Sequence, residues 1–195
     1  MNCILLAFIF QTCVLAGAAK KNRTKPTLET LRDFLNTRDT IFIYSASAPQ
    51  YDYDDLMKDE ILGDIGDEKC TQYTPTKLGE DNYTLQMTFM LGSAWKNKTV
   101  YAALGQNKHG RPYMDESKTL GGYGTEHFLK AYDAAVGCAF FKYVYSTNGF
   151  YCETHVLASK VKSYHRRNGD ICRYLTRRTC GNVTVTYNVN CSPQC

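Results

Sequence analysis

Apolar and polar residues alternate along much of this chain, which predicts a protein built mainly of β-strands. The clearest case is residues 83–91, where every second side chain is large and apolar, the period of a strand with one buried face. Eight other stretches predict further strands, of which those in 70–73 and 109–118 are weak. They fall in residues 40–46, 70–73, 95–104, 109–118, 127–132, 138–145, 149–158 and 183–189.

Two segments carry the helical period instead. Three leucines at helical spacing follow Pro26 and predict a short helix over 27–35, because proline suits a first helical turn. Residues 170–181 predict a second helix, with Asp170 as N-cap and Gly181 as C-terminal stop. The Asn148-Gly149 pair is a strong hairpin turn. A short helix, about seven or eight strands, a C-terminal helix and a last strand favour a single sandwich or barrel.

The N-terminal segment indicates the compartment. Residues 1–19 carry no charge, hold an apolar run over 4–10 and end in small residues before Lys20, which is the layout of a signal peptide. The alternative is an N-terminal membrane anchor, for which the run is short. We therefore expect residues 20–195 to form one secreted domain without a membrane segment. Four sequons agree with secretion and predict N-glycosylation at Asn22, Asn82, Asn97 and Asn182.

Nine cysteines are typical of a disulfide-bonded extracellular protein. Removal of the signal peptide takes away Cys3 and Cys13 and leaves seven, an odd number that predicts three disulfides and one cysteine left over. No Cys-x-x-Cys occurs among the seven. The sequence therefore indicates neither a zinc ribbon nor thioredoxin-like redox chemistry.

Charge and motif content argue against several function classes. The formal charge of +4 is small and does not imply a nucleic-acid partner. The four histidines lack metal-ligand spacing, and the chain has neither a Gly-x-Ser-x-Gly motif nor a phosphate-binding glycine loop. We therefore expect no enzyme activity, no metal and no cofactor. A basic cluster of Lys160, Lys162 and residues 165–167 predicts a solvated face or a glycosaminoglycan contact.

The cysteines also indicate which side chains face the interior. If Cys138 and Cys152 bond to cysteines of the helix at 170–180, they face outward, because an eight-stranded barrel has no room for a helix inside. Alternation along the two strands then turns one set of side chains inward, namely Ala139, Phe141, Tyr143, Tyr145, Tyr151, Glu153 and His155. An inward Glu153 would meet pocket water, pair with His155 or a lysine, or hold a cationic ligand. In the opposite register it is a solvated surface carboxylate.

The same region resembles a known family, the tick salivary lipocalins that include the histamine-binding proteins. The resemblance is most specific in residues 137–143 (Gly-Cys-Ala-Phe-Phe-Lys-Tyr) and, after the Asn-Gly turn, in 151–156 (Tyr-Cys-Glu-Thr-His-Val). It implies a mainly β fold, a lipocalin-like eight-stranded antiparallel barrel with a short N-terminal helix and a C-terminal helix packed outside. Further similarity lies in residues 34–44, Cys70, 170–181 and 187–191.

The resemblance also implies a disulfide pattern. In that pattern one cysteine, Cys195, is left over, and the alternative is that it replaces Cys191 or Cys180. The implied pairs are Cys70 with Cys191, Cys138 with Cys172, and Cys152 with Cys180.

Members of the family are secreted into the bite and sequester host mediators, and their amine binders use inward carboxylates and aromatic rings. Of the family's carboxylates, Glu153 alone lands on a matching position, and His155 stands where the family has a tryptophan. The resemblance therefore implies that the barrel binds a host biogenic amine, histamine or serotonin, and so suppresses inflammation and haemostasis at a feeding site. We expect Glu153 to hold the ammonium. The expected aromatic wall is Tyr143, Phe141, Tyr151 and Tyr44, with Trp95 as an alternative to Tyr44.

Two other functions remain open at this point. The stripe of Met87, Phe89 and Leu91 is suited to a lipid mediator, such as a leukotriene, thromboxane or a fatty acid, provided that an inward lysine or arginine meets the ligand's carboxylate. Alternatively, the long polar loops at 49–68 and 105–126 carry a protein-binding module that acts on a host complement or immune component.

Overall fold

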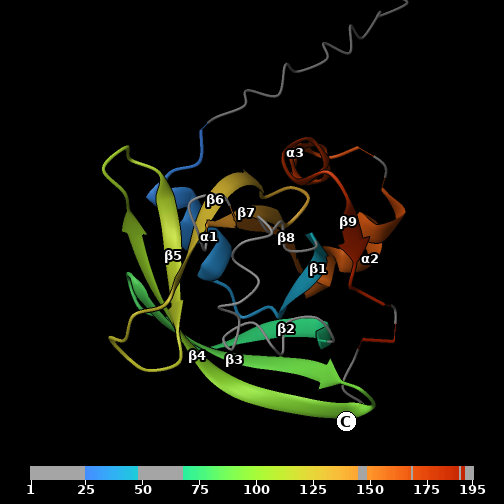
Figure 1. The fold of residues 1–195 in the computed structure, drawn as a ribbon, viewed down its shortest axis with the longest axis horizontal. Helices are drawn as coiled ribbons and strands as arrows, with labels where there is room; N and C mark the ends of the chain where they lie inside the picture. The colour runs from blue at the N-terminus through green and yellow to red at the C-terminus, as the bar shows by residue number, and fades with distance from the viewer. Residues whose placement is uncertain (1–24, 48–67, 145–148, 168, 189, 192–195) are drawn as a thin grey trace, which may run out of the picture.

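Eight antiparallel strands close into a barrel in the computed structural model of the chain, which describes residues 25–47, 68–144, 149–167, 169–188 and 190–191 (Figure 1). Each strand pairs with the next along the chain, and the first strand pairs with both the second and the eighth. The predicted barrel is therefore confirmed. Its strands are β1 (Ile41–Ser47), β2 (Glu68–Lys77), β3 (Asn82–Leu91), β4 (Ala94–Gln106), β5 (Pro112–Ser117), β6 (Thr125–Asp133), β7 (Cys138–Val144) and β8 (Phe150–Leu157).

The barrel closes at β1, which has three neighbours. Ile41 and Phe42 pair with β2, while the pairing with β8 runs along most of β1. A ninth short strand, β9 (Val183–Val185), pairs with Ser45–Ser47 on β1. The final strand predicted over 183–189 is therefore shorter than expected, and it lies outside the closed barrel.

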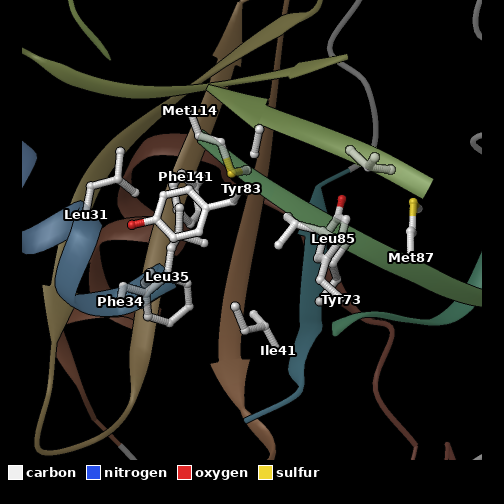
Figure 2. Close-up of a cluster of buried hydrophobic side chains, with 14 of the residues drawn as sticks. Leu31, Phe34, Leu35, Ile41, Tyr73, Tyr83, Leu85, Met87, Met114 and Phe141 are labelled. Carbon is white, nitrogen blue, oxygen red and sulfur yellow. The ribbon is translucent and has the colours of Figure 1, made fainter. Parts of the chain in front are cut away.

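Helix α1 (Leu28–Leu35) covers the end of the barrel at which β1 begins. A capping box between Thr27 and Thr30 fixes its first turn, and Arg32 pairs with Asp81 at 2.8 Å. Its buried face joins the interior core, and Figure 2 shows Leu31, Phe34 and Leu35 directed toward Tyr83 and Phe141. The predicted helix over 27–35 therefore forms an apolar floor to the barrel.

Two further helices, α2 (Ala158–Arg166) and α3 (Ile171–Cys180), pack outside the wall on one side of the molecule, next to β9 (Figure 1). Asp170 caps α3, since its carboxylate accepts from the Arg173 backbone N–H at 2.9 Å. The sequence did not predict α2, because Val161 and Tyr164 are its only buried residues and two positions make a weak periodic signal. Side chains between these helices and the wall form a second apolar layer, called here the outer layer.

Three disulfides join the barrel to the segment that follows it. They tie both ends of α3 to the neighbouring strands β7 and β8, and they tie β2 to the chain after β9. Loop closure of this kind stabilises a fold by restricting the unfolded chain. The pairs are Cys138 with Cys172, Cys152 with Cys180, and Cys70 with Cys191, the three that the family resemblance implied; Cys195 lies outside the described residues.

Alternation along the strands divides inner from outer side chains. Phe141 and Tyr143 belong to the interior core, whereas Cys138 and Cys152 belong to the outer layer, as the sequence predicted. The weak strand signals at 70–73 and 109–118 correspond to the full barrel strands β2 and β5. Among the described residues, no helix is both long and apolar enough to cross a membrane.

Candidate functional site

Six polar side chains meet inside the barrel and form a closed ring of contacts, called here the polar ring. Buried polar groups need partners, because losing water without a replacement hydrogen bond costs about 1–3 kcal/mol. The ring supplies partners to two carboxylates. Its members come from five strands: Tyr73 on β2, Glu116 on β5, His127 on β6, Tyr143 on β7, and Glu153 and His155 on β8.

Glu153 is the more deeply buried carboxylate, with 7% of its surface exposed. The Tyr143 hydroxyl donates to its Oε2 atom, and Nε2 of His155 lies 2.6 Å from the same oxygen. These charge-assisted hydrogen bonds replace the water that the carboxylate loses. Phe141 lies beneath the ring, with its centroid 4.7 Å from that of His155 and 6.2 Å from that of Phe34 in the floor.

Glu116 occupies the other half of the ring. The Tyr73 hydroxyl donates to its Oε2 atom at 3.0 Å. Because β3 and β4 separate β2 from β5 in the sheet, this bond crosses the interior rather than following the wall. Nδ1 of His127 lies 3.8 Å from the same carboxylate oxygen, and that nitrogen is buried with no hydrogen-bond partner in the part of the chain that the structure describes.

Ring contacts join the two halves. The ring of Tyr143 lies against that of His127, with centroids 3.8 Å apart, and Tyr73 faces His155 at 5.8 Å. Tyr151 stacks on Tyr143 with centroids 5.4 Å apart. The site therefore combines two acceptor groups with several aromatic faces, the combination that recognises an organic cation.

Burial sets the protonation states of two ring members. It lowers the pKa of His127 well below the usual value, and the charge of His155 lowers it further. Burial, followed by the negative charge of Glu153, raises the pKa of Tyr143 well above the usual value. At neutral pH, His127 is therefore uncharged and the Tyr143 hydroxyl keeps its proton as a donor.

One group of potential metal ligands occurs among the described residues, outside the barrel. It consists of Cys138, Asp170 and Cys172, whose ligand atoms lie within 4.8 Å of one another. Both sulfur atoms belong to the same disulfide, and a disulfide lacks the thiolates that bind metals. The group is therefore a structural contact at the start of α3.

Four of the residues expected around a ligand lie together. Glu153, Tyr143 and Phe141 are buried on the inner face, and Tyr151 is half-buried against them. They come from the neighbouring strands β7 and β8, which the Asn148-Gly149 turn was expected to join. The expected inner residue Tyr145 lies outside the described residues.

Tyr44 lies elsewhere, and its expected place in the aromatic wall needs correction. It packs in the outer layer, where its ring meets that of Tyr164 at 4.7 Å and its hydroxyl accepts from Arg173 at 3.0 Å. On β1 the inner side chains are instead those of Ile41 and Ile43. The alternative Trp95 also packs against the outer layer.

Three members of the polar ring were not identified from the sequence: Tyr73, Glu116 and His127. A signal for two of them was present, because Glu116 follows Met114 by two positions and His127 precedes Leu129 by two. Met114 and Leu129 are both interior core residues, and residues two apart share a strand face. For Tyr73, the weak strand signal gave no basis for a face.

The expected glycosylation sites remain predictions. Asn82 begins β3, Asn97 lies on β4 and Asn182 follows α3, and the structure exposes all three, as a glycan requires. Asn22 and the expected signal peptide at 1–19 lie outside the described residues.

No protein-family model matches the sequence, and no curated protein is significantly similar to it. Among solved structures, Japanin from Rhipicephalus appendiculatus bound to cholesterol is similar with a TM-score of 0.49 and 11% identity, covering 76% of this chain and 91% of that chain. Lobster apocrustacyanin A1 is similar with a TM-score of 0.38 and 11% identity, covering 81% of this chain and 98% of that chain. Similarity at these values does not indicate a ligand for this chain, and the barrel is assigned from its own strand pairing.

Proposed function

We propose that this protein is a secreted binding protein that holds a small organic cation at the polar ring, and that the cation is a biogenic amine such as histamine or serotonin. The observation that carries the proposal is the pair of carboxylates, Glu153 and Glu116, inside a barrel whose walls present aromatic rings to them. The resemblance of residues 137–156 to the tick histamine-binding proteins supports the same proposal. Sequestration needs no turnover, so the role is binding and not catalysis.

Recognition in this proposal depends on exchange of hydrogen-bond donors. In the structure, tyrosine hydroxyls donate to both carboxylates. An ammonium group takes the place of the Tyr143 hydroxyl on Glu153, and the ligand's ring packs against Tyr151 and Phe141. A cation donates more strongly to a carboxylate than a neutral hydroxyl does, so the exchange favours the bound state. Removing a mediator in this way would suppress inflammation and haemostasis at a feeding site.

The test is calorimetric titration of the secreted protein with histamine and with serotonin, comparing Glu153→Gln with wild type. Replacing the carboxylate by an amide of the same shape removes a charged hydrogen bond, for which we expect about a 10- to 100-fold loss of affinity. Glu126→Gln is the matched control, because Glu126 is exposed on β6. Unchanged binding by Glu153→Gln, in a protein with a native circular dichroism spectrum, would remove Glu153 from the mechanism.

A second candidate, an apolar ligand with a carboxylate, is favoured by the position of Lys98. This residue lies directly opposite Met87, and directly opposed side chains share a face of the sheet, so Lys98 lies on the inner face. Its ammonium is 5.0 Å from the centre of the Phe89 ring. Lys98 thus supplies the cation that a lipid acid needs beside the stripe of Met87 and Phe89.

Titration with a leukotriene distinguishes the two candidates. If the lipid is the ligand, Lys98→Gln weakens its binding and Glu153→Gln does not. If the amine is the ligand, the effects are reversed. Absence of binding to histamine, serotonin and the leukotriene would contradict both the amine and the lipid candidate and favour the protein-binding function.

A further inference from the structure

We propose that the outer face of α2 and α3 binds an extended sulfated polysaccharide. Residues 158–182 carry seven of the chain's 23 lysines and arginines but only one of its 19 aspartates and glutamates, so the rest of the chain has 16 basic and 18 acidic residues. The whole positive excess of the protein therefore comes from this segment. Clustered charge of one sign raises the local concentration of an oppositely charged partner.

The single acidic residue of the segment does not neutralise this surface. Asp170 is buried, with 7% of its surface exposed, and its carboxylate serves Arg173, whose backbone N–H and Nε lie 2.9 and 3.5 Å from its oxygens. Among the described residues, no acidic side chain forms an ion pair with the exposed cations of the two helices or with Arg167, which follows α2. Those cations are Lys160, Lys162, Arg166, Arg167, Arg177 and Arg178.

Contacts bring the end of α2 beside α3. Arg173 donates from Nη1 to the Arg167 carbonyl at 2.7 Å and from Nη2 to the Tyr164 carbonyl at 2.7 Å. An open hollow of about 480 Å³ lies next to this junction, and four of its five lining residues are on α3. The four are Arg173, Tyr174, Arg177 and Arg178, and the fifth is Gly169, which precedes α3.

The fold holds this surface in place before any partner binds. Two disulfides fix α3 to the barrel wall, one at Cys172 near its start and one at Cys180 at its end. The guanidinium of Arg173 lies over the Tyr164 ring at 4.5 Å, and this contact holds α3 against the end of α2 within the surface. A preorganised surface loses less conformational entropy on binding.

The chemistry of the surface favours a sulfated polysaccharide over a membrane. Arginine is the main cation here, and its planar guanidinium binds the oxygens of sulfate or phosphate through two parallel hydrogen bonds. Tyr174, 45% exposed, is the one large exposed apolar side chain on α2 and α3. A helix that lies on a lipid surface needs a continuous apolar face to insert. The two helices lie outside the barrel wall and the polar ring lies inside it, so we expect this surface to bind its partner without using the polar ring.

The experiment measures binding of the full secreted chain to immobilised heparin, the probe for the sulfated polysaccharide, at about 0.15 M salt. We expect the double variant Arg177→Ala/Arg178→Ala to bind about three- to tenfold more weakly and to elute at lower salt. Lys108→Ala/Arg111→Ala is the matched control, because it removes the same charge from the exposed β4–β5 turn. The control should bind as the wild type does.

Several results would overturn the proposal. Absence of retention at this salt concentration would do so, and so would an equal loss in both double variants, which would mean that only net charge matters. Equal or tighter binding to phosphatidylserine vesicles would assign the surface to a membrane instead, and equal binding to a single-stranded oligonucleotide would show unselective attraction of polyanions. Glu153→Gln should bind heparin as the wild type does, so failure of the barrel proposal leaves this one intact.

Discussion

The hydrogen bond from Tyr143 to Glu153 yields the sharpest prediction for the polar ring. Tyr143→Phe removes this donor and keeps the ring, including its packing on His127 at 3.8 Å and on Tyr151 at 5.4 Å. No cavity forms, because the two side chains differ by one hydroxyl oxygen. The change therefore isolates a single buried hydrogen bond to a carboxylate.

The magnitude follows from that bond. A hydrogen bond to a charged group contributes about 1.5–3 kcal/mol to the free energy of unfolding. His155 remains on Glu153 at 2.6 Å, so the carboxylate keeps one partner and the cost stays within this range. For a domain of this size, each kcal/mol lowers the midpoint of thermal unfolding by about 2–4 °C, so we expect a decrease of about 3–12 °C.

The assay is thermal and urea unfolding at pH 7, followed by circular dichroism. Tyr123→Phe is the matched control, because that side chain is fully exposed and the same hydroxyl is removed. A midpoint within 1 °C of the wild type for Tyr143→Phe would refute the reasoning, since the hydrogen bond would then contribute nothing in solution.

Amine titration adds a second readout: the hydroxyl competes with the ammonium for Glu153, so Tyr143→Phe should bind an amine at least as tightly as the wild type. A loss as large as that of Glu153→Gln would contradict the exchange.

Two further predictions concern the stability of the fold. Burial lowers the pKa of His127, so the unfolded chain takes up a proton near pH 6.5 while the folded chain does not, and the free energy of unfolding should fall as the pH drops below about 6.5. In urea unfolding at a series of pH values, His127→Gln should show a shallower fall than the wild type. Parallel curves of unfolding free energy against pH for the two proteins would contradict this. The Cys70–Cys191 disulfide spans 121 residues and Cys152–Cys180 spans 28, which in the loop-entropy account gives about 4.9 and 3.6 kcal/mol. Replacing the first pair by alanines should therefore destabilise the protein more than replacing the second, and the reverse order in urea unfolding would refute the entropic account.

The sequence predicted the inner and outer faces of some strands of the candidate site correctly and failed on others. On β7 and β8 the cysteines marked the outer face, and alternation then placed Phe141, Tyr143 and Glu153 correctly on the inner one. On β1 every residue is buried, because the outer layer covers the face that would otherwise meet water. Without a polar face, hydrophobic alternation carried no information about Tyr44, and its position was wrong.

The contacts of the polar ring could not be predicted from the sequence. Glu116 and His127 lie on strands that are neighbours in the sheet, but the bond from Tyr73 to Glu116 crosses the barrel between strands that are not paired with each other. Contacts across the interior depend on the curvature and closure of the whole sheet, which no local pattern specifies. The same holds for Arg173 of α3, which donates to the Tyr164 and Arg167 carbonyls at the end of α2 because both helices pack outside the wall.

The sequence by itself determined the β-rich class, the succession of strands along the chain and the helices α1 and α3, because each depends on periodicity, turn residues and caps within a short segment. The cysteines added the inner and outer faces of β7 and β8. Local patterns left a sandwich and a barrel open, and the tertiary structure decided that β1 closes the sheet against both β2 and β8, that two carboxylates share one interior and that Arg173 of α3 meets the end of α2. These features depend on contacts between residues far apart in the chain, and such contacts form only when the sheet and its disulfides fix the strands and helices in space.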